Sequence, residues 1–116
     1  MSFQKILIVK GIKYLLEPSK KENKKYDVYY VFNNEDLNDP GLKKNEFMKR
    51  YLLSYGDIRY EDYTQHKNDR RKELYKSRHK NDFIYNPNYA GFWSYWMLWN
   101  KKTINESIKD IEKRFN

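Results

Sequence analysis

The sequence predicts a single α+β domain in which an N-terminal antiparallel β-hairpin or small sheet packs against three or four helices. The N-terminal segment alternates and is rich in β-branched residues, whereas later segments carry apolar residues at helical spacing. Aromatic residues make up 18% of the 116 residues, which supplies enough apolar area for one packed core. We expect residues 1–32 to form the hairpin part and residues 39–116 the helical part.

The pattern of apolar residues in the N-terminal part predicts two or three strands. Residues 3–17 are apolar and β-branched, and Gly11 interrupts them where a bulge or turn would lie. A polar, basic loop follows over residues 18–25. The next segment alternates as a half-buried strand requires, and it places on one face Tyr26, Val28, Tyr30 and Phe32.

Residues 39–56 predict a helix. Asp39 is a suitable N-cap, and Pro40 suits the first helical position, where no backbone N–H is needed. Gly56 then ends the helix as a C′ residue. Between these ends, the apolar residues at helical spacing are Phe47, Met48, Tyr51, Leu52 and Tyr55.

Three further helices are expected beyond Gly56. Residues 60–80 contain no Gly or Pro, which favours one continuous helix, and a connector over residues 81–88 follows. A short helix over residues 91–99 is expected to be buried, because its aromatic residues recur at helical spacing. Thr103 and Glu106 form a capping box for a terminal helix. The apolar stripe of that helix is Ile104, Ile108, Ile111 and Phe115.

The chain is basic, with 24 Lys and Arg against 16 Asp and Glu and a formal net charge of +8. This excess favours polyanionic partners, namely nucleic acid, anionic lipid or an acidic protein surface. Zero cysteines exclude disulfides, thiolate metal sites and cysteine nucleophiles, and suit a reducing compartment. The apolar run near the N-terminus is too short for a signal peptide or a membrane span, so we expect a cytosolic protein.

The C-terminal half, from about residue 70, contains a recognisable pattern. A basic run ending in Tyr75-x-x-Arg78-His79 precedes Gly91, the pair Phe92-Trp93, and Leu98-Trp99. This pattern resembles an uncharacterised module of small basic proteins from giant (nucleocytoplasmic large DNA) viruses. The resemblance implies a virion-associated structural role, a location in the virion and in the virus factory of the infected-cell cytoplasm, and no catalytic residues.

One helix face of the basic run is a candidate binding site. Arg71, Tyr75 and Arg78 lie at i, i+4 and i+7, so two guanidinium groups flank one ring. The face either grips phosphates and stacks on bases, or it packs inside the domain, with the Arg stems over the aromatic helix. The candidate residues for binding a partner or nucleic acid are Lys67, Arg70, Arg71, Lys72, Tyr75, Lys76, Arg78 and His79.

Signals for catalysis and metal binding are weak. Asp62, His66, Asp69 and Glu73 share the opposite face of that helix, but neighbouring lysines would pair with them as solvated surface. The sequence has no glycine-rich phosphate loop, no HExxH and no nucleophile elbow. We therefore expect no catalytic residue, no cofactor, no metal and no small-molecule substrate.

Two functions fit these observations. The first is a non-catalytic minor capsid or core component of a large DNA virus that bridges other virion proteins. The second is a basic protein that binds packaged viral DNA or RNA through residues 67–80. Salt dependence separates them, because phosphate binding weakens steeply as counterions compete.

Overall fold

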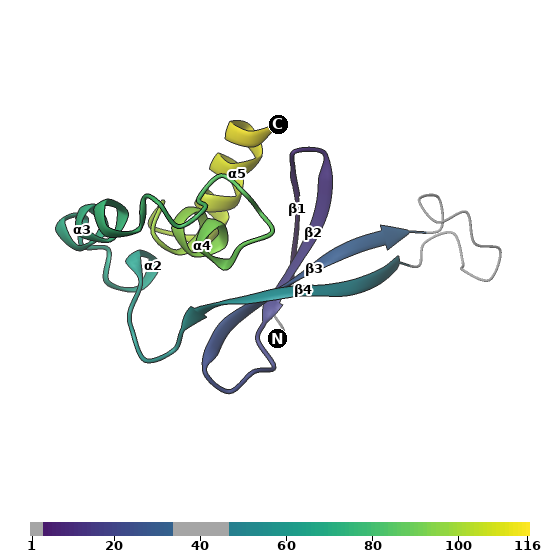
Figure 1. Ribbon diagram of the computed structural model, residues 1–116, viewed down its shortest axis with the longest axis horizontal. Helices are drawn as coiled ribbons and strands as arrows, with labels where there is room; N and C mark the ends of the chain where they lie inside the picture. Colours follow the sequence, from purple (N-terminus) through teal and green to yellow (C-terminus); the bar gives the residue numbers. More distant parts are fainter. Residues whose placement is uncertain (1–3, 34–46) are drawn as a thin grey trace.

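The computed structural model describes residues 4–33 and 47–116 and confirms the predicted α+β class. Four strands, β1 (Lys5–Val9), β2 (Ile12–Pro18), β3 (Lys24–Asn33) and β4 (Phe47–Asp57), form an antiparallel sheet in the order β1-β2-β3-β4. The helices are α2 (Tyr63–His66), α3 (Asp69–His79), α4 (Ala90–Trp93), the π-helical turn η1 (Ser94–Leu98) and α5 (Ile104–Phe115). Figure 1 shows the helices gathered at one side of the sheet, while β3 and β4 extend beyond them.

The turn predicted at Gly11 is confirmed. Lys10 and Gly11 have φ angles of 51° and 80° and close the hairpin between the paired residues Val9 and Ile12. Positive φ at both central residues is the geometry of a type I′ turn, which matches the twist of the two strands it joins.

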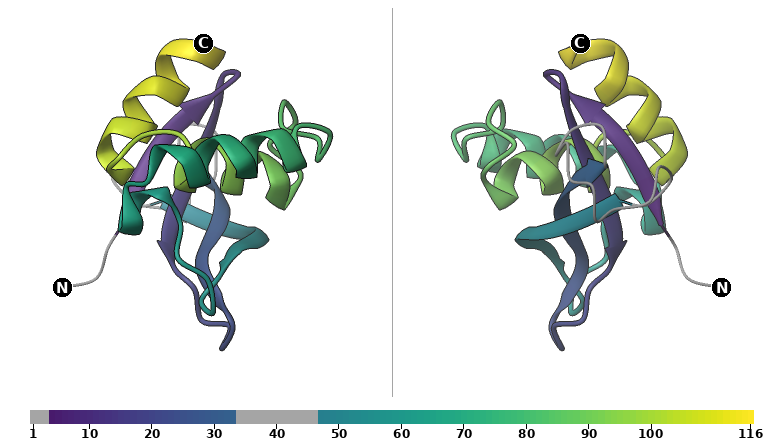
Figure 2. Two further views of the ribbon diagram at one scale, coloured as in Figure 1. Left: turned by 90° about the vertical axis from the view of Figure 1, so that its left-hand side faces the viewer. Right: turned by 90° about the vertical axis from the view of Figure 1, so that its right-hand side faces the viewer.

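Side chains from the end of α5 cover the free edge of β1. Glu112 Oε2 accepts the Ile8 N–H at 3.2 Å, and Asn116 Nδ2 donates to the Ile8 carbonyl at 2.7 Å. Asn116 Oδ1 also accepts the Gly11 N–H at 3.3 Å. Both views of Figure 2 place α5 beside the β1–β2 hairpin. These contacts occupy backbone groups that an uncovered edge strand would offer to another chain.

The prediction of a helix over residues 39–56 is wrong for the part of this segment that the structure describes. Residues 47–57 form β4, which pairs with β3 through Tyr26–Tyr55 and Val28–Leu53. The spacing of Tyr and Leu residues in this segment fits both a helix and a strand, and pairing with β3 selects the strand. The expected start at Asp39 and Pro40 lies outside the described residues. The sheet therefore extends to Asp57, well beyond residue 32.

Gly56 has the positive φ that the sequence predicted, but inside β4 and not at a helix end. Its φ is 81°, and a Cβ built there would lie 3.0 Å from Leu98 Cδ1 and 3.0 Å from Lys25 Cβ. Glycine therefore serves both the backbone conformation and the close approach of η1 to the sheet.

The single helix predicted over residues 60–80 is interrupted. Lys67 adopts a left-handed conformation with φ 54° and separates α2 from α3. Asp62 and Gln65 form a capping box at the start of α2, and the Asn68 side chain accepts the Arg71 N–H at 3.0 Å to start α3. Two side-chain caps six residues apart thus divide the segment without Gly or Pro.

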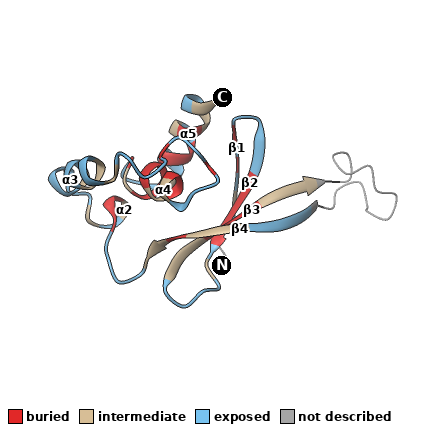
Figure 3. Ribbon diagram, in the orientation of Figure 1, coloured by how far each residue is buried: buried red, intermediate tan, exposed pale blue. Residues whose placement is uncertain are grey.

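The aromatic helix predicted at the centre of the domain is confirmed as buried, with its second half in π-helical form. Trp93 is fully buried, lies 5.1 Å from the Tyr14 ring, and donates from Nε1 to the Pro87 carbonyl at 2.8 Å. Figure 3 shows the buried residues concentrated in this segment, in α5 and across the sheet. The α5 stripe is confirmed too, since Ile108 and Ile111 are buried and Thr103 accepts the Glu106 N–H.

Gly91 permits a close approach between α4 and the preceding loop. A Cβ at this position would overlap the backbone carbonyl oxygen of Asp82. We predict that Gly91→Ala lowers the free energy of unfolding by roughly 1–3 kcal/mol through this overlap, although a helical Gly→Ala change otherwise stabilises. Urea unfolding measures the difference.

The matched control for Gly91→Ala is Lys109→Ala at an exposed position of α5. We expect this control to stay within about 0.5 kcal/mol of the unmodified protein. A Gly91→Ala protein as stable as the control would contradict the close approach.

Candidate binding groove between α3 and β4

A groove of about 790 Å³ lies between α3, the end of β4 and the α4–η1 segment. Its basic lining residues are Lys24, Lys25, Arg71, Arg78 and His79. Its acidic lining residues are Asp57, Glu61, Asp62 and Asp82. Tyr55, Tyr60, Tyr75 and Trp99 supply aromatic surface. The groove is therefore mixed in charge and rich in rings.

A stack of rings forms one wall of the groove and fixes α3 to the domain. The Tyr75 ring lies 4.2 Å from the Trp99 ring at an interplanar angle of 3°, and 4.1 Å from the His79 ring. Burial raises the pKa of Tyr75 to about 12, so its hydroxyl stays protonated. No residue of α3 is fully buried, so this stack carries much of the helix's attachment.

Two lysines of α3 also attach the helix to the domain. Lys72 Nζ lies 4.8 Å from the centre of the Tyr63 ring. Lys76 Nζ lies 5.2 Å from the Tyr95 ring and 5.9 Å from the Trp96 ring. Cation–π contacts to the domain, which the sequence suggested for Arg71 and Arg78, are thus made by Lys72 and Lys76.

Arg71 and Arg78 lie on the groove side of α3 and are both exposed. Arg71 comes within only 3.9 Å of Glu61, and these two side chains are 48% and 63% exposed. An ion pair of this length and exposure contributes little stability. Arg78 has no ion-pair, hydrogen-bond or ring partner in the described part of the chain. Both guanidinium groups are available to a ligand.

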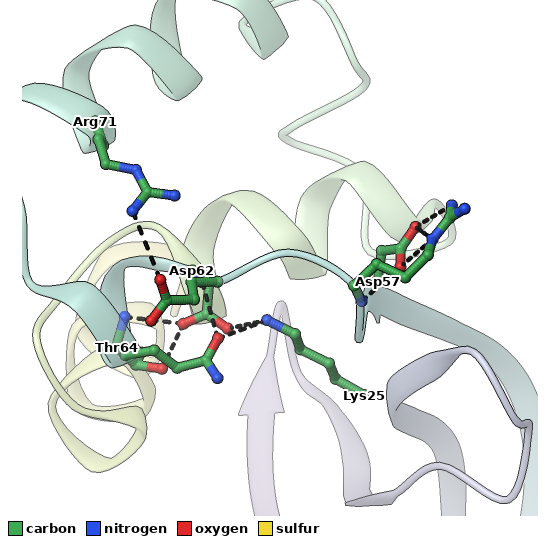
Figure 4. A network of polar contacts seen from close by, with 8 residues as sticks. Lys25, Asp57, Asp62, Thr64 and Arg71 are labelled. Carbon is green, nitrogen blue, oxygen red and sulfur yellow. Dashed lines mark hydrogen bonds and ion pairs between the residues drawn. The ribbon is translucent and has the colours of Figure 1, made fainter.

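Three of the four carboxylates that line the groove have polar partners, and Figure 4 shows the contacts of Asp57 and Asp62. Lys25 Nζ contacts Asp62 Oδ2 at 2.7 Å and Gln65 Oε1 at 2.8 Å, and the Thr64 N–H donates to Asp62 Oδ1. Hydrogen bonds from Arg59 lower the pKa of Asp57 to about 2. His79 Nδ1 lies 2.6 Å from Asp82 Oδ2.

Tyr55 closes the inner end of the groove with a buried hydroxyl. This hydroxyl has no hydrogen-bond partner among the described residues. Burial raises the pKa of Tyr55 well above its usual value, and the neighbouring Tyr26 and Asp62 act in the same direction. The group therefore keeps its proton and remains a hydrogen-bond donor.

Four of the eight predicted binding residues line the groove: Arg71, Tyr75, Arg78 and His79. Lys72 and Lys76 contact rings outside the groove lining, Lys67 caps α2, and Arg70 is exposed outside the groove. The sequence did not predict that Lys24 and Lys25 of β3 face this helix, because residues 47–57, which pair with β3, were expected to be helical.

The predicted acidic and histidine stripe does not assemble. Asp62 caps α2 and pairs with Lys25, while Asp69 accepts the Tyr63 hydroxyl at 2.6 Å. Within residues 4–33 and 47–116, no three His, Asp or Glu side chains come together as metal ligands. In the same residues, no helix is both long and apolar enough to cross a bilayer.

Fold and groove together define the class: a small α+β domain with a four-stranded antiparallel sheet and a mixed-charge groove beside α3. The chain belongs to the family of unknown function DUF5754, which matches residues 14–79. This segment contains most of β2 and all of β3, β4, α2 and α3, and it overlaps the giant-virus pattern only over residues 70–79. No curated protein and no solved structure matches the chain.

His66 lies beneath the ring stack and is sensitive to protonation. Its Nδ1 accepts the Asn68 N–H at 2.9 Å, its ring lies 5.2 Å from Trp99, and its Nε2 is buried without a hydrogen-bond partner among the described residues. Burial lowers the pKa of His66, and Arg71 lowers it further. The neutral imidazole is thus favoured in the folded protein.

We predict that His66 makes the protein less stable as the pH falls below about 6.5, its ordinary pKa. The unfolded chain binds the proton first, so the free energy of unfolding decreases until the pH passes the lower pKa of the folded state. Urea unfolding at several pH values should show that the free energy of unfolding decreases less for His66→Gln than for the unmodified protein. His79→Gln is the control and should retain the decrease; equal slopes for His66→Gln and the unmodified protein would contradict the prediction.

Proposed function

We propose that the protein is a non-catalytic interaction module that binds a segment of a partner protein in the groove between α3 and β4. One observation carries the proposal: Arg71 and Arg78 remain exposed beside the Tyr75–Trp99 stack, while Asp57, Asp62 and Asp82 already have partners. Exposed guanidinium groups next to flat aromatic surface are typical of protein recognition sites.

The mixed charge of the groove favours a peptide over a nucleic acid. Four carboxylates line it together with the cations, and Glu61 is largely exposed near Arg71. A phosphate backbone carries only negative charge and would be repelled by Glu61, whereas a peptide offers charges of both signs and apolar side chains. The occupant that fits is an extended segment with a carboxylate for Arg78 and an aromatic or aliphatic side chain for the ring stack.

The setting of this function is taken from the resemblance to giant-virus proteins. We propose a minor capsid or core component that bridges other virion proteins, located in the virion and in the virus factory of the infected-cell cytoplasm. A second candidate function, binding of packaged viral nucleic acid, is favoured by the net charge of +8. The cations that suit it lie outside the groove lining.

Charge reversal tests the groove directly. We predict that Arg71→Glu with Arg78→Glu weakens peptide binding at least about tenfold, or roughly 1.4 kcal/mol, because both guanidinium groups lie at the groove. Ligands are selected from a displayed random peptide library on the unmodified protein, and affinities are then measured by fluorescence anisotropy. Selected peptides should share an acidic residue next to an aromatic or aliphatic one.

The matched control is Lys67→Glu with Arg70→Glu, which makes the same charge change on the neighbouring segment outside the groove. Both double variants should keep their free energy of unfolding to within about 1 kcal/mol, because all four side chains are exposed. Peptides that bind both variants equally would place their site elsewhere and overturn the groove assignment.

A further inference from the structure

Four cations from three segments, none of which lines the groove, gather beside α3. Lys76 Nζ lies 5.9 Å, and the Arg114 guanidinium 4.6 Å, from the Trp96 ring, so both lie against one indole. Lys72 follows one helical turn before Lys76 in α3, and Lys101 precedes α5. Lys101 interacts electrostatically with both α3 lysines.

These cations are poorly compensated by carboxylates. Asp110 accepts hydrogen bonds from Asn100 at 2.7 Å and from Arg114 at 3.2 Å and 3.3 Å. In the described part of the chain, no carboxylate oxygen lies within 4.0 Å of the ammonium groups of Lys72, Lys76 or Lys101. The three ammonium groups are therefore not held in direct ion pairs by the described residues, although Asp69, Asp110 and Glu73 act on Lys72 electrostatically.

Burial and neighbouring cations both lower the pKa values of the two α3 lysines. Burial first, and then Lys101, lower the pKa of Lys72, although Asp69, Asp110 and Glu73 act in the opposite direction. Burial, followed by Lys72, Arg114 and Lys101, lowers the pKa of Lys76. A bound anion would relieve this repulsion, because it places negative charge among cations that the fold holds together.

We propose that Lys72, Lys76, Lys101 and Arg114 form a site for the phosphate backbone of nucleic acid. The site is separate from the peptide groove, and two of its members, Lys101 and Arg114, lie outside residues 67–80. Several fixed cations on one surface match the repeated charges of a phosphate backbone.

The rings beneath the cations limit the ways in which this site can bind a ligand. Tyr95 and Trp96 are only 8% and 5% exposed, so neither ring is free to insert into a bilayer or to stack on a base. Binding at this site therefore depends on phosphate charge alone and is independent of base sequence.

The test is binding of a labelled mixed-sequence DNA duplex of about 20 base pairs between about 50 and 200 mM salt, followed by anisotropy. The variant Lys72→Gln with Lys101→Gln should bind more weakly, and the slope of log affinity against log salt should fall by nearly 2, about 0.9 per lost contact. The control Lys13→Gln with Lys20→Gln removes the same charge from exposed strand and loop positions and should change the slope by less than about 0.5.

Lys101→Gln alone provides a second variant, since Lys101 is exposed and has no ring contact in the described residues. This variant should lower the slope of log affinity against log salt by about 0.9 and leave the midpoint temperature of thermal unfolding unchanged. Equal slopes for the two double variants, or no DNA binding by the unmodified protein at low salt, would overturn the site. Loss of binding to phosphatidylserine vesicles in Lys72→Gln with Lys101→Gln, with DNA binding intact, would assign the cluster to a membrane instead.

Discussion

The burial of Trp93 against the sheet is the contact on which the arrangement of the helices depends. Its ring lies 5.1 Å from Tyr14 of β2 and 6.2 Å from Tyr55 of β4, and its indole N–H is bound by the Pro87 carbonyl. One side chain thus joins two strands to the loop that precedes α4. Because Gly91 lets that loop approach the helix closely, the position of the whole helical layer follows from this segment.

The spacing of residues along the chain predicted the α+β class and most of the helices and strands. It failed at residues 47–57, where pairing with another strand determines the structure. The turn at Gly11 and the stripe of α5 depend on neighbouring residues, so the sequence revealed them. Residues 47–57 include aromatic residues and leucines whose spacing suits both a helix and a strand, and pairing with β3 selects the strand. Gly56 illustrates the limit: its positive φ was predicted, but the element that needs it was not.

The same distinction applies to the binding sites. Arg71, Tyr75 and Arg78 share a helix, and their spacing alone predicted a common face. The residues opposite them come from β3 and from the turn after η1, and no spacing along the chain relates these segments to α3. Lys101 and Arg114 were missed for the same reason, because they reach Lys72 and Lys76 only through the packing of α5.

The two proposed sites share α3, and this has a physical consequence. The helix has no fully buried residue and is attached by the Tyr75 stack and by the ring contacts of Lys72 and Lys76. An anion at the lysines would reduce the repulsion among these cations, and we expect it to favour the position in which α3 is attached. Because Arg71 and Arg78 belong to the same helix, the groove would become better ordered at the same time. Linkage would then require that a ligand in the groove favour the anion in return, so we expect the two proposed ligands to bind cooperatively.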